Sequence, residues 1–200
     1  MNTQTHVLIA SVLFSKSGAG NTARNIAAIS GGLLPDLVIF IMFFWSKLTG
    51  TPEQVVWRDW YFNSNWQLAI DISNSLLLFI TLLAIGLAIG KWHKQNAKYG
   101  FLLVIFSVAA ITHLAGDFFL HVDDAHAHFW PLSDWRYASP FSYWNPDHHG
   151  RTISMFEAML GISLSIVLFR RFGGMAVRGL LILAVVAYVA VPAYFIFFAH

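Results

Sequence analysis

The chain of 200 residues is 57% hydrophobic and only 11% charged, and its mean hydropathy is +0.61. These values are typical of an integral membrane protein and exclude an ordinary soluble domain. The absence of cysteine excludes disulfides and thiolate-bound metals. The net charge of +2, without a basic stripe interleaved with aromatic residues, argues against a nucleic-acid partner.

Apolar runs along the chain predict transmembrane helices, because about 20 apolar residues cross about 30 Å of hydrocarbon and roughly 17 are just enough. Five such runs cover residues 25–45, 69–90, 99–122, 153–169 and 177–199. The run 5–14 is too short to cross and predicts a partial or re-entrant helix. It lacks a basic flank before it, so no cleavable signal peptide is expected.

The predicted fold is therefore all-α, a polytopic membrane helix bundle. It forms a single integral-membrane domain over residues 1–200, with about five transmembrane helices and a short N-terminal helix. The aromatic-rich loop 123–151 is predicted to fold over the outer face as a cap.

Lysines and arginines cluster in three connections between these runs. They are Lys16 with Arg24, then Lys91, Lys94 and Lys98, then Arg170, Arg171 and Arg178. By the positive-inside tendency these connections face the cytoplasm, which places loops 46–68 and 123–151 on the periplasmic side of a bacterial inner membrane. Both loops are rich in tryptophan, which favours placement at the membrane boundary over a surface for stacking substrates.

The first predicted span contains a proline in the stretch Gly31-Gly32-Leu33-Leu34-Pro35-Asp36. Proline removes a backbone donor and disfavours helix at the preceding residue, so the helix is expected to break or kink here. Asp36 follows at about mid-depth of the membrane. Two interpretations are open: Asp36 caps the break by accepting from freed backbone amides, or it is a functional acid.

Ionisable residues from distant segments are predicted to share one buried layer. Counted at about 1.5 Å per helical residue from the nearest basic residue, His6, Asp36 and His113 lie roughly 15–22 Å deep, and Asp117 lies one turn further. Isolated charges at such depth cost several kcal/mol, so these groups must pair, neutralise one another or bind an ion. A divalent metal suits this set of imidazoles and carboxylates, with zinc favoured over manganese or iron. Mutual neutralisation is the alternative.

Residues 112–150 carry six of the nine histidines and five of the eight aspartates. His113, Asp117 and His121 recur at intervals of four, so on a helix they share one face. The outer residues could bind a second metal, orient ligands or contact substrate, namely His121, Asp124, His126, His128, His148 and His149. For His126, His148 and His149, a solvated loop histidine is favoured. His93 and His200 are predicted to be unrelated to the site.

Three short motifs stand in the order Thr5-His6, Leu34-Pro35-Asp36 and Thr112-His113-x3-Asp117. In this order the chain resembles the small bacterial inner-membrane metal-dependent hydrolases, some of them LexA-regulated, which are distantly similar to zinc-dependent phospholipase C. The resemblance implies a hydrolase with a metal bound by His6, Asp36, His113 and Asp117. Two positions depart from the family pattern: Val38 stands where a second acid often follows, and His121 stands where no ligand is usual.

These residues together predict a membrane-embedded metal-dependent hydrolase that acts on a phosphoester or other ester of an amphiphilic or lipid substrate. Asp124, Asp71 or Glu157 would be the general base, or would orient the metal and its ligands, and His121 or His128 the acid for the leaving group. Arg136, Arg151 and His128 would contact the substrate, since guanidinium pairs with phosphate. A structural salt bridge from Arg136 to Asp134 or Asp123 is the alternative.

Two other classes of protein remain open. One is a non-catalytic accessory or assembly subunit of a membrane complex, with a structural metal or ion-pair site and a docking surface in the tryptophan-rich loops. The other is a haem protein with His6 and His113 as ligands. Haem is the weaker of the two, because the adjacent carboxylates suit a harder ion.

Overall fold

The computed structural model describes residues 1–197, which contain helices and no strand. The helices are α1 (Thr3–Phe14), α2 (Thr22–Leu33), α3 (Leu37–Thr49), α4 (Glu53–Val55), α5 (Ser64–Ser73), α6 (Leu76–Trp92), α7 (Ala97–Phe118), α8 (Gly150–Arg171) and α9 (Met175–Phe197). Shorter helical turns are η1 (Ala19–Asn21), η2 (Leu34–Asp36), η3 (Val56–Trp60), η4 (Lys94–Asn96) and η5 (Pro146–His148).

Within the described residues, five helical stretches are long and apolar enough to cross a membrane, and α1 is a shorter apolar helix. The stretches are Ala19–Thr49, Ser64–Trp92, Lys94–Phe118, Gly150–Arg171 and Met175–Ala193. The prediction of an all-α membrane bundle with five spans and a short N-terminal helix is therefore confirmed. The end of the predicted run 177–199, with His200, lies outside the described residues.

Two predicted boundaries are wrong. Helix α7 ends at Phe118 rather than at residue 122, so His121 does not continue the helical face of His113 and Asp117. The segment 46–68, expected as a loop, is largely helical, because α3 runs on to Thr49 and is followed by α4, η3 and the start of α5. By contrast, residues 119–149 form a cap that is irregular apart from the short turn η5, as the spacing of their prolines predicts.

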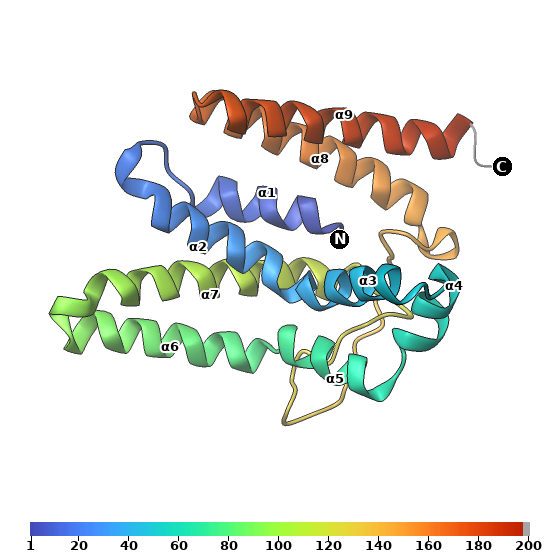
Figure 1. Cartoon of the computed structure of the whole chain (residues 1–200), viewed down its shortest axis with the longest axis horizontal. Coiled ribbons are helices and arrows are strands. Elements are labelled where there is room, and N and C mark those ends of the chain that lie inside the picture. Colours follow the sequence, from blue (N-terminus) through green and yellow to red (C-terminus); the bar gives the residue numbers. More distant parts are fainter. Residues whose placement is uncertain (198–200) are drawn as a thin grey trace.

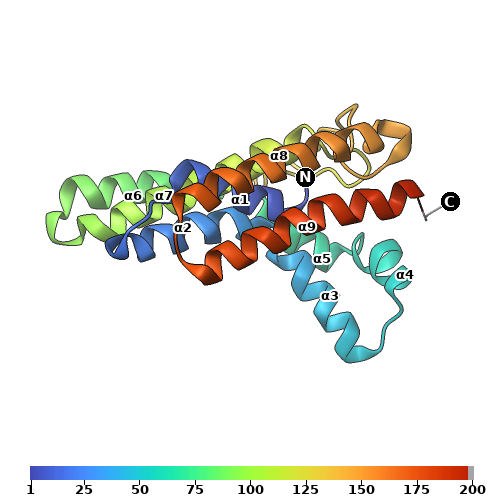
Figure 2. The same ribbon diagram turned by 90° about the horizontal axis from the view of Figure 1, so that it is seen from above.

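The helices lie side by side in the order α9, α8, α1, α2, α7 and α6 (Figure 1). The short helix α1 thus lies inside the bundle, between α8 on one side and α2 and α7 on the other. At η2 the chain changes direction, and Figure 2 shows α3 turning away from the line of α2. The break predicted at Pro35 is confirmed. It ends α2 beside α1 and α7 and points the following residue, Asp36, into the bundle, where it is buried.

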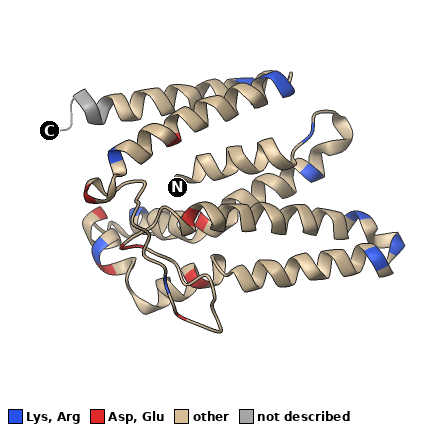
Figure 3. Ribbon diagram, turned by 180° about the vertical axis from the view of Figure 1, so that it is seen from behind, with Lys and Arg blue, Asp and Glu red and all other residues tan. Residues whose placement is uncertain are grey.

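Charged residues divide between the two ends of the bundle. Lys and Arg mark the turns α1–α2, α6–α7 and α8–α9 at one end, whereas Asp and Glu lie toward the other end with a few further Lys and Arg (Figure 3). The cap formed by residues 119–149 is at the acidic end. A polarised distribution of this kind is typical of a membrane protein with a fixed orientation.

Helix α1 is only 12 residues long, or about 18 Å, so both of its ends require partners inside the protein. At its start, Glu157 of α8 accepts from the backbone N–H of Asn2 at 2.7 Å and from the Thr5 hydroxyl at 2.7 Å. At its end, Arg171 of α8 donates to the carbonyl oxygens of Ser11, Val12 and Ser15 at 2.8–3.2 Å. Acid at the N-terminus and guanidinium at the C-terminus also complement the helix dipole.

Two glycines allow α2 to approach α1 and α7 closely. A Cβ atom at Gly31 would lie 2.3 Å from the carbonyl oxygen of Phe106 in α7, and one at Gly32 would lie 2.9 Å from the Cβ of Ala10 in α1. Contacts this short cannot form, so any side chain at either position would push helices apart. The two glycines therefore determine how closely α1, α2 and α7 converge.

We expect Gly31→Ala to lower the midpoint of thermal unfolding in detergent, since overpacking of this kind costs about 1–3 kcal/mol. Gly90→Ala on α6 is the matched control, because nothing lies within 4 Å of a Cβ there. The close packing of α2 on α7 would be contradicted if both variants melted at the wild-type temperature.

Candidate metal centre

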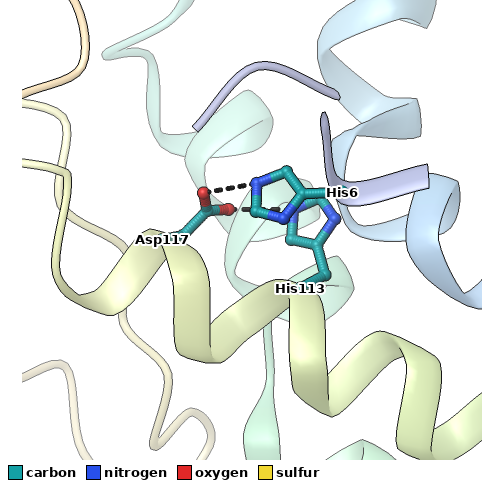
Figure 4. Close-up of side chains that lie close together, drawn as sticks. All are labelled: His6, His113 and Asp117. Carbon is teal, nitrogen blue, oxygen red and sulfur yellow. Dashed lines mark hydrogen bonds and ion pairs between the residues drawn. The ribbon is translucent and has the colours of Figure 1, made fainter. Parts of the chain in front are cut away.

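The shared face of α1 and α7 brings three predicted ligands together. The Asp117 carboxylate lies 2.8 Å from His6 Nε2 through Oδ1 and 2.8 Å from His113 Nε2 through Oδ2. The two imidazole rings stack with their centroids 3.6 Å apart, and the carboxylate faces the same edge of both (Figure 4). All three side chains are almost fully buried. Their ligand atoms lie within 4.8 Å of one another, so one ion could bind all three.

The orientation of His113 suits a metal ligand. Its Nδ1 lies 2.8 Å from the carbonyl oxygen of Gly32, which can only accept, so Nδ1 carries the proton. Its Nε2 then points at carboxylates yet makes no hydrogen bond, although it is buried. A backbone carbonyl that fixes the tautomer of a histidine is a common support for metal ligation. This Nε2 lies 2.8 Å from Asp117 Oδ2 and 3.5 Å from Asp36 Oδ1, so an ion bound there would also meet carboxylate oxygens. The two-histidine, one-carboxylate set fits zinc, manganese or iron.

Asp36 lies beside this group and outside the set of three. Its Oδ1 is 3.5 Å from His113 Nε2, and its Oδ2 accepts from the Thr3 hydroxyl at 2.5 Å. It makes no side-chain hydrogen bond to the backbone at the start of α3, so the capping interpretation is wrong. Asp36 is thus positioned to orient His113 or to act as a further ligand.

A second group of candidate ligands lies on the cap side of Asp117. It consists of Asp117, His121 and His126, whose ligand atoms also lie within 4.8 Å of one another. His121 Nε2 is 3.2 Å from Asp117 Oδ1, and its Nδ1 is 3.0 Å from Asp124 Oδ2. His126, expected to be a solvated loop residue, is instead 3% exposed, so that expectation is wrong.

The N-terminal ammonium of Met1 also contacts the candidate ligands. The Met1 ammonium donates to Asp117 Oδ1 at 2.8 Å and lies 3.5 Å from His121 Nε2. Asp117 thus has four nitrogen atoms of different residues around it. The contact of Met1 could not be predicted from the sequence, because residues more than a hundred positions apart meet there.

The ionisable side chains of the cap differ in their charge. Burial disfavours charge on His121, but the Asp117 carboxylate outweighs it and raises the pKa of His121 to about 9. Burial likewise opposes ionisation of Asp124, but the His121 contact prevails and lowers the pKa of Asp124. Burial and repulsion by His121 lower the pKa of His126 to about 3. At neutral pH, a cation bound at His121 must displace a proton, whereas His126 is already neutral, the form in which histidine binds metals.

The other predicted catalytic and substrate residues lie apart from the two groups. Glu157 accepts from Asn2 and Thr5 at the start of α1. His128 is buried and its Nδ1 donates to the carbonyl oxygen of Asn74 at 3.1 Å. Arg151 is exposed at the start of α8. Catalysis by Glu157 and substrate binding by His128 and Arg151 stay predictions.

Arg136 ties the cap to the end of the second span. It donates to both carboxylate oxygens of Asp71 at 2.7 and 2.9 Å and to the carbonyl oxygen of Ala125 at 2.8 Å. The salt bridge expected for Arg136 is present, but its partner is Asp71 rather than Asp134 or Asp123. Asp71 is thereby committed to the cap and lies outside both groups of candidate ligands.

Three histidines lie at the surface, as expected: His93, His148 and His149. His93 and His149 are exposed and His148 is partly exposed. The sequence did contain one signal for the burial of His126, since the run Ala125-His126-Ala127-His128 alternates small residues with imidazoles. Both alanines are buried, which lets the backbone of the cap pack closely over α7.

Replacing Arg136 by Ala is expected to loosen the cap, because Asp71 then remains buried without its partner. The cost should be about 1–2 kcal/mol, less than for a fully buried pair, since the Arg136 side chain is 33% exposed. Hydrogen exchange of cap amides should therefore accelerate by about tenfold. Arg151→Ala is the control and should leave exchange unchanged. Equal exchange in both variants would show that Arg136 does not hold the cap.

Comparisons with protein-family models, with curated proteins and with solved structures gave no match. The function must therefore be inferred from the residues of the site and from the fold that positions them.

Proposed function

We propose that the protein is a membrane-embedded metal-dependent hydrolase that acts on an ester, most simply a phosphoester, of an amphiphilic or lipid substrate. The observation that carries this proposal is the buried set of His6, His113 and Asp117, whose ligand atoms lie within 4.8 Å of one another. Three protein ligands of this kind are the number found at catalytic zinc sites, which keep one position open. A divalent ion here would supply a Lewis acid that activates water near neutral pH and polarises the ester.

The residues of the chain have separate roles in this proposal. His6, His113 and Asp117 bind the ion, and the Gly32 carbonyl holds the proton of His113 on Nδ1 so that Nε2 faces the ion. Asp124 is ionised and lies 3.0 Å from His121 Nδ1, so this carboxylate can take up and return a proton near the site. The resemblance to inner-membrane metal-dependent hydrolases points in the same direction. The position of the site within the bundle favours a substrate that reaches it from the membrane.

A non-catalytic assembly subunit is the second candidate function. It is favoured by the close pairing of Asp117 with its own neighbours, which leaves its charge compensated. The haem alternative is not supported by the geometry, because imidazoles stacked with centroids 3.6 Å apart cannot lie on opposite faces of a porphyrin.

Metal content and hydrolysis together test the proposal. Purified wild-type protein is expected to retain zinc, manganese or iron and to hydrolyse a fluorogenic phospholipid or phosphodiester in nanodiscs. Asp117→Ala should lose the metal and at least 100-fold in rate, because removing a ligand removes the ion. His93→Ala is the matched control and should behave as wild type. Metal retained without hydrolysis of any ester in the panel would favour the assembly subunit.

We also propose that the protein lies in a bacterial inner membrane with loops 46–68 and 123–151 on the periplasmic side. The gathering of basic turns at one end supports this orientation. Since the chain lacks cysteine, single cysteines report on it without background.

We expect Leu132→Cys in the cap to react with a membrane-impermeant maleimide in intact spheroplasts, since Leu132 is 82% exposed. Ser17→Cys in the exposed α1–α2 turn should react only after the membrane is permeabilised. The reverse pattern of labelling would show that the orientation in the membrane is opposite to the one proposed.

A further inference from the structure

We propose that the protein binds a second divalent cation between Asp117, His121 and His126, and that the Asp117 carboxylate is shared by both ions. The inference rests on the proposed metal centre and deepens it, because it makes the centre binuclear.

The second group of ligands has the same composition as the first and compatible distances. Asp117 Oδ1 lies 3.2 Å from His121 Nε2, and the ligand atoms of all three residues lie within 4.8 Å of one another. Bonds of about 2.0–2.1 Å in a tetrahedral zinc site separate ligand atoms by about 3.3 Å. Small side-chain movements would therefore close these residues around an ion.

His126 supplies an independent observation. The residue is 3% exposed, and its Nε2 is buried without a hydrogen-bond partner. A buried polar atom in this condition destabilises the protein unless something binds it. The ring of His126 packs against that of His121 with centroids 4.8 Å apart, so both imidazoles lie at the same side of Asp117.

His121 is oriented as a metal ligand by a neighbouring acid. Asp124 Oδ2 lies 3.0 Å from His121 Nδ1, which favours a proton on Nδ1, so that Nε2 is the nitrogen that would give up its proton to a cation beside Asp117. Asp124 is itself held by the Trp144 indole, which donates to Oδ2 at 3.2 Å. Carboxylates commonly orient metal-binding histidines in this way. The Met1 ammonium lies 2.8 Å from Asp117 Oδ1 and 3.5 Å from His121 Nε2, so a second ion would take its place beside this carboxylate oxygen.

The shared carboxylate determines what the pair of ions could do. A carboxylate has about four acceptor positions. Asp117 can therefore bind one ion together with His6 and His113 and a second ion together with His121 and His126. Two ions about 3.5–4 Å apart stabilise both the attacking and the leaving oxygen in a displacement at phosphorus. The substrate class that fits a binuclear centre at this depth is therefore a phosphoester of an amphiphile.

Counting ions in purified full-length protein tests the proposal. The protein is stripped with a chelator, reloaded with zinc chloride, desalted and analysed by mass spectrometry for zinc per chain. Wild type is expected to hold two ions, His126→Ala one, and His6→Ala one. The double variant should hold none. His148→Ala, in the same cap and without a side-chain hydrogen bond in the described part of the chain, should hold two.

A second measurement needs no variant. Wild-type protein loaded with manganese should give the electron paramagnetic resonance spectrum of an exchange-coupled pair rather than of isolated ions. One zinc ion per wild-type chain, or two ions in His126→Ala, would overturn the second site, as would an uncoupled manganese spectrum. Two ions without hydrolysis would contradict the proposed function and leave the second site intact, so the two failures are distinguishable.

Discussion

Several distant segments of the chain meet around one buried negative charge, the carboxylate of Asp117. Its side chain is 1% exposed, and an isolated negative charge in such surroundings costs several kcal/mol. The charge is tolerated because nitrogen atoms of Met1, His6, His113 and His121 surround it at 2.8–3.2 Å. These groups come from the start of the chain, from α7 and from the cap. One carboxylate thus joins parts of the protein that are far apart in sequence.

The backbone makes this convergence possible. Gly31 and Gly32 allow α2 to lie almost in backbone contact with α7 and α1, and the Gly32 carbonyl, in the last turn of α2 before the break at Pro35, accepts from His113. The same few residues that end α2 therefore align an imidazole. The spacing of the helices and the orientation of His113 are coupled at this point, so a change in helix spacing would first move the candidate ligands.

Much of this arrangement follows from the sequence, because hydrophobic length, the proline break and the depth of ionisable residues are local properties. They predicted the five spans, the short first helix and the layer that holds His6, Asp36, His113 and Asp117. The end of α7 at Phe118 was not predictable from periodicity, since the apolar pattern continues for several residues. The pairing of Arg136 with Asp71 depends on how the cap folds, and no local pattern encodes such a long-range contact. For the burial of His126, the two flanking alanines are the one local signal.

The double attachment of α1 to α8 has a consequence for the biogenesis of the protein. A helix of 12 residues cannot be stable alone in lipid, because its terminal amides and carbonyls would lack partners. Those partners, Glu157 and Arg171, are translated some 150 residues later. The two ends of the helix that leaves the ribosome first therefore gain these hydrogen-bond partners only after α8 has been made.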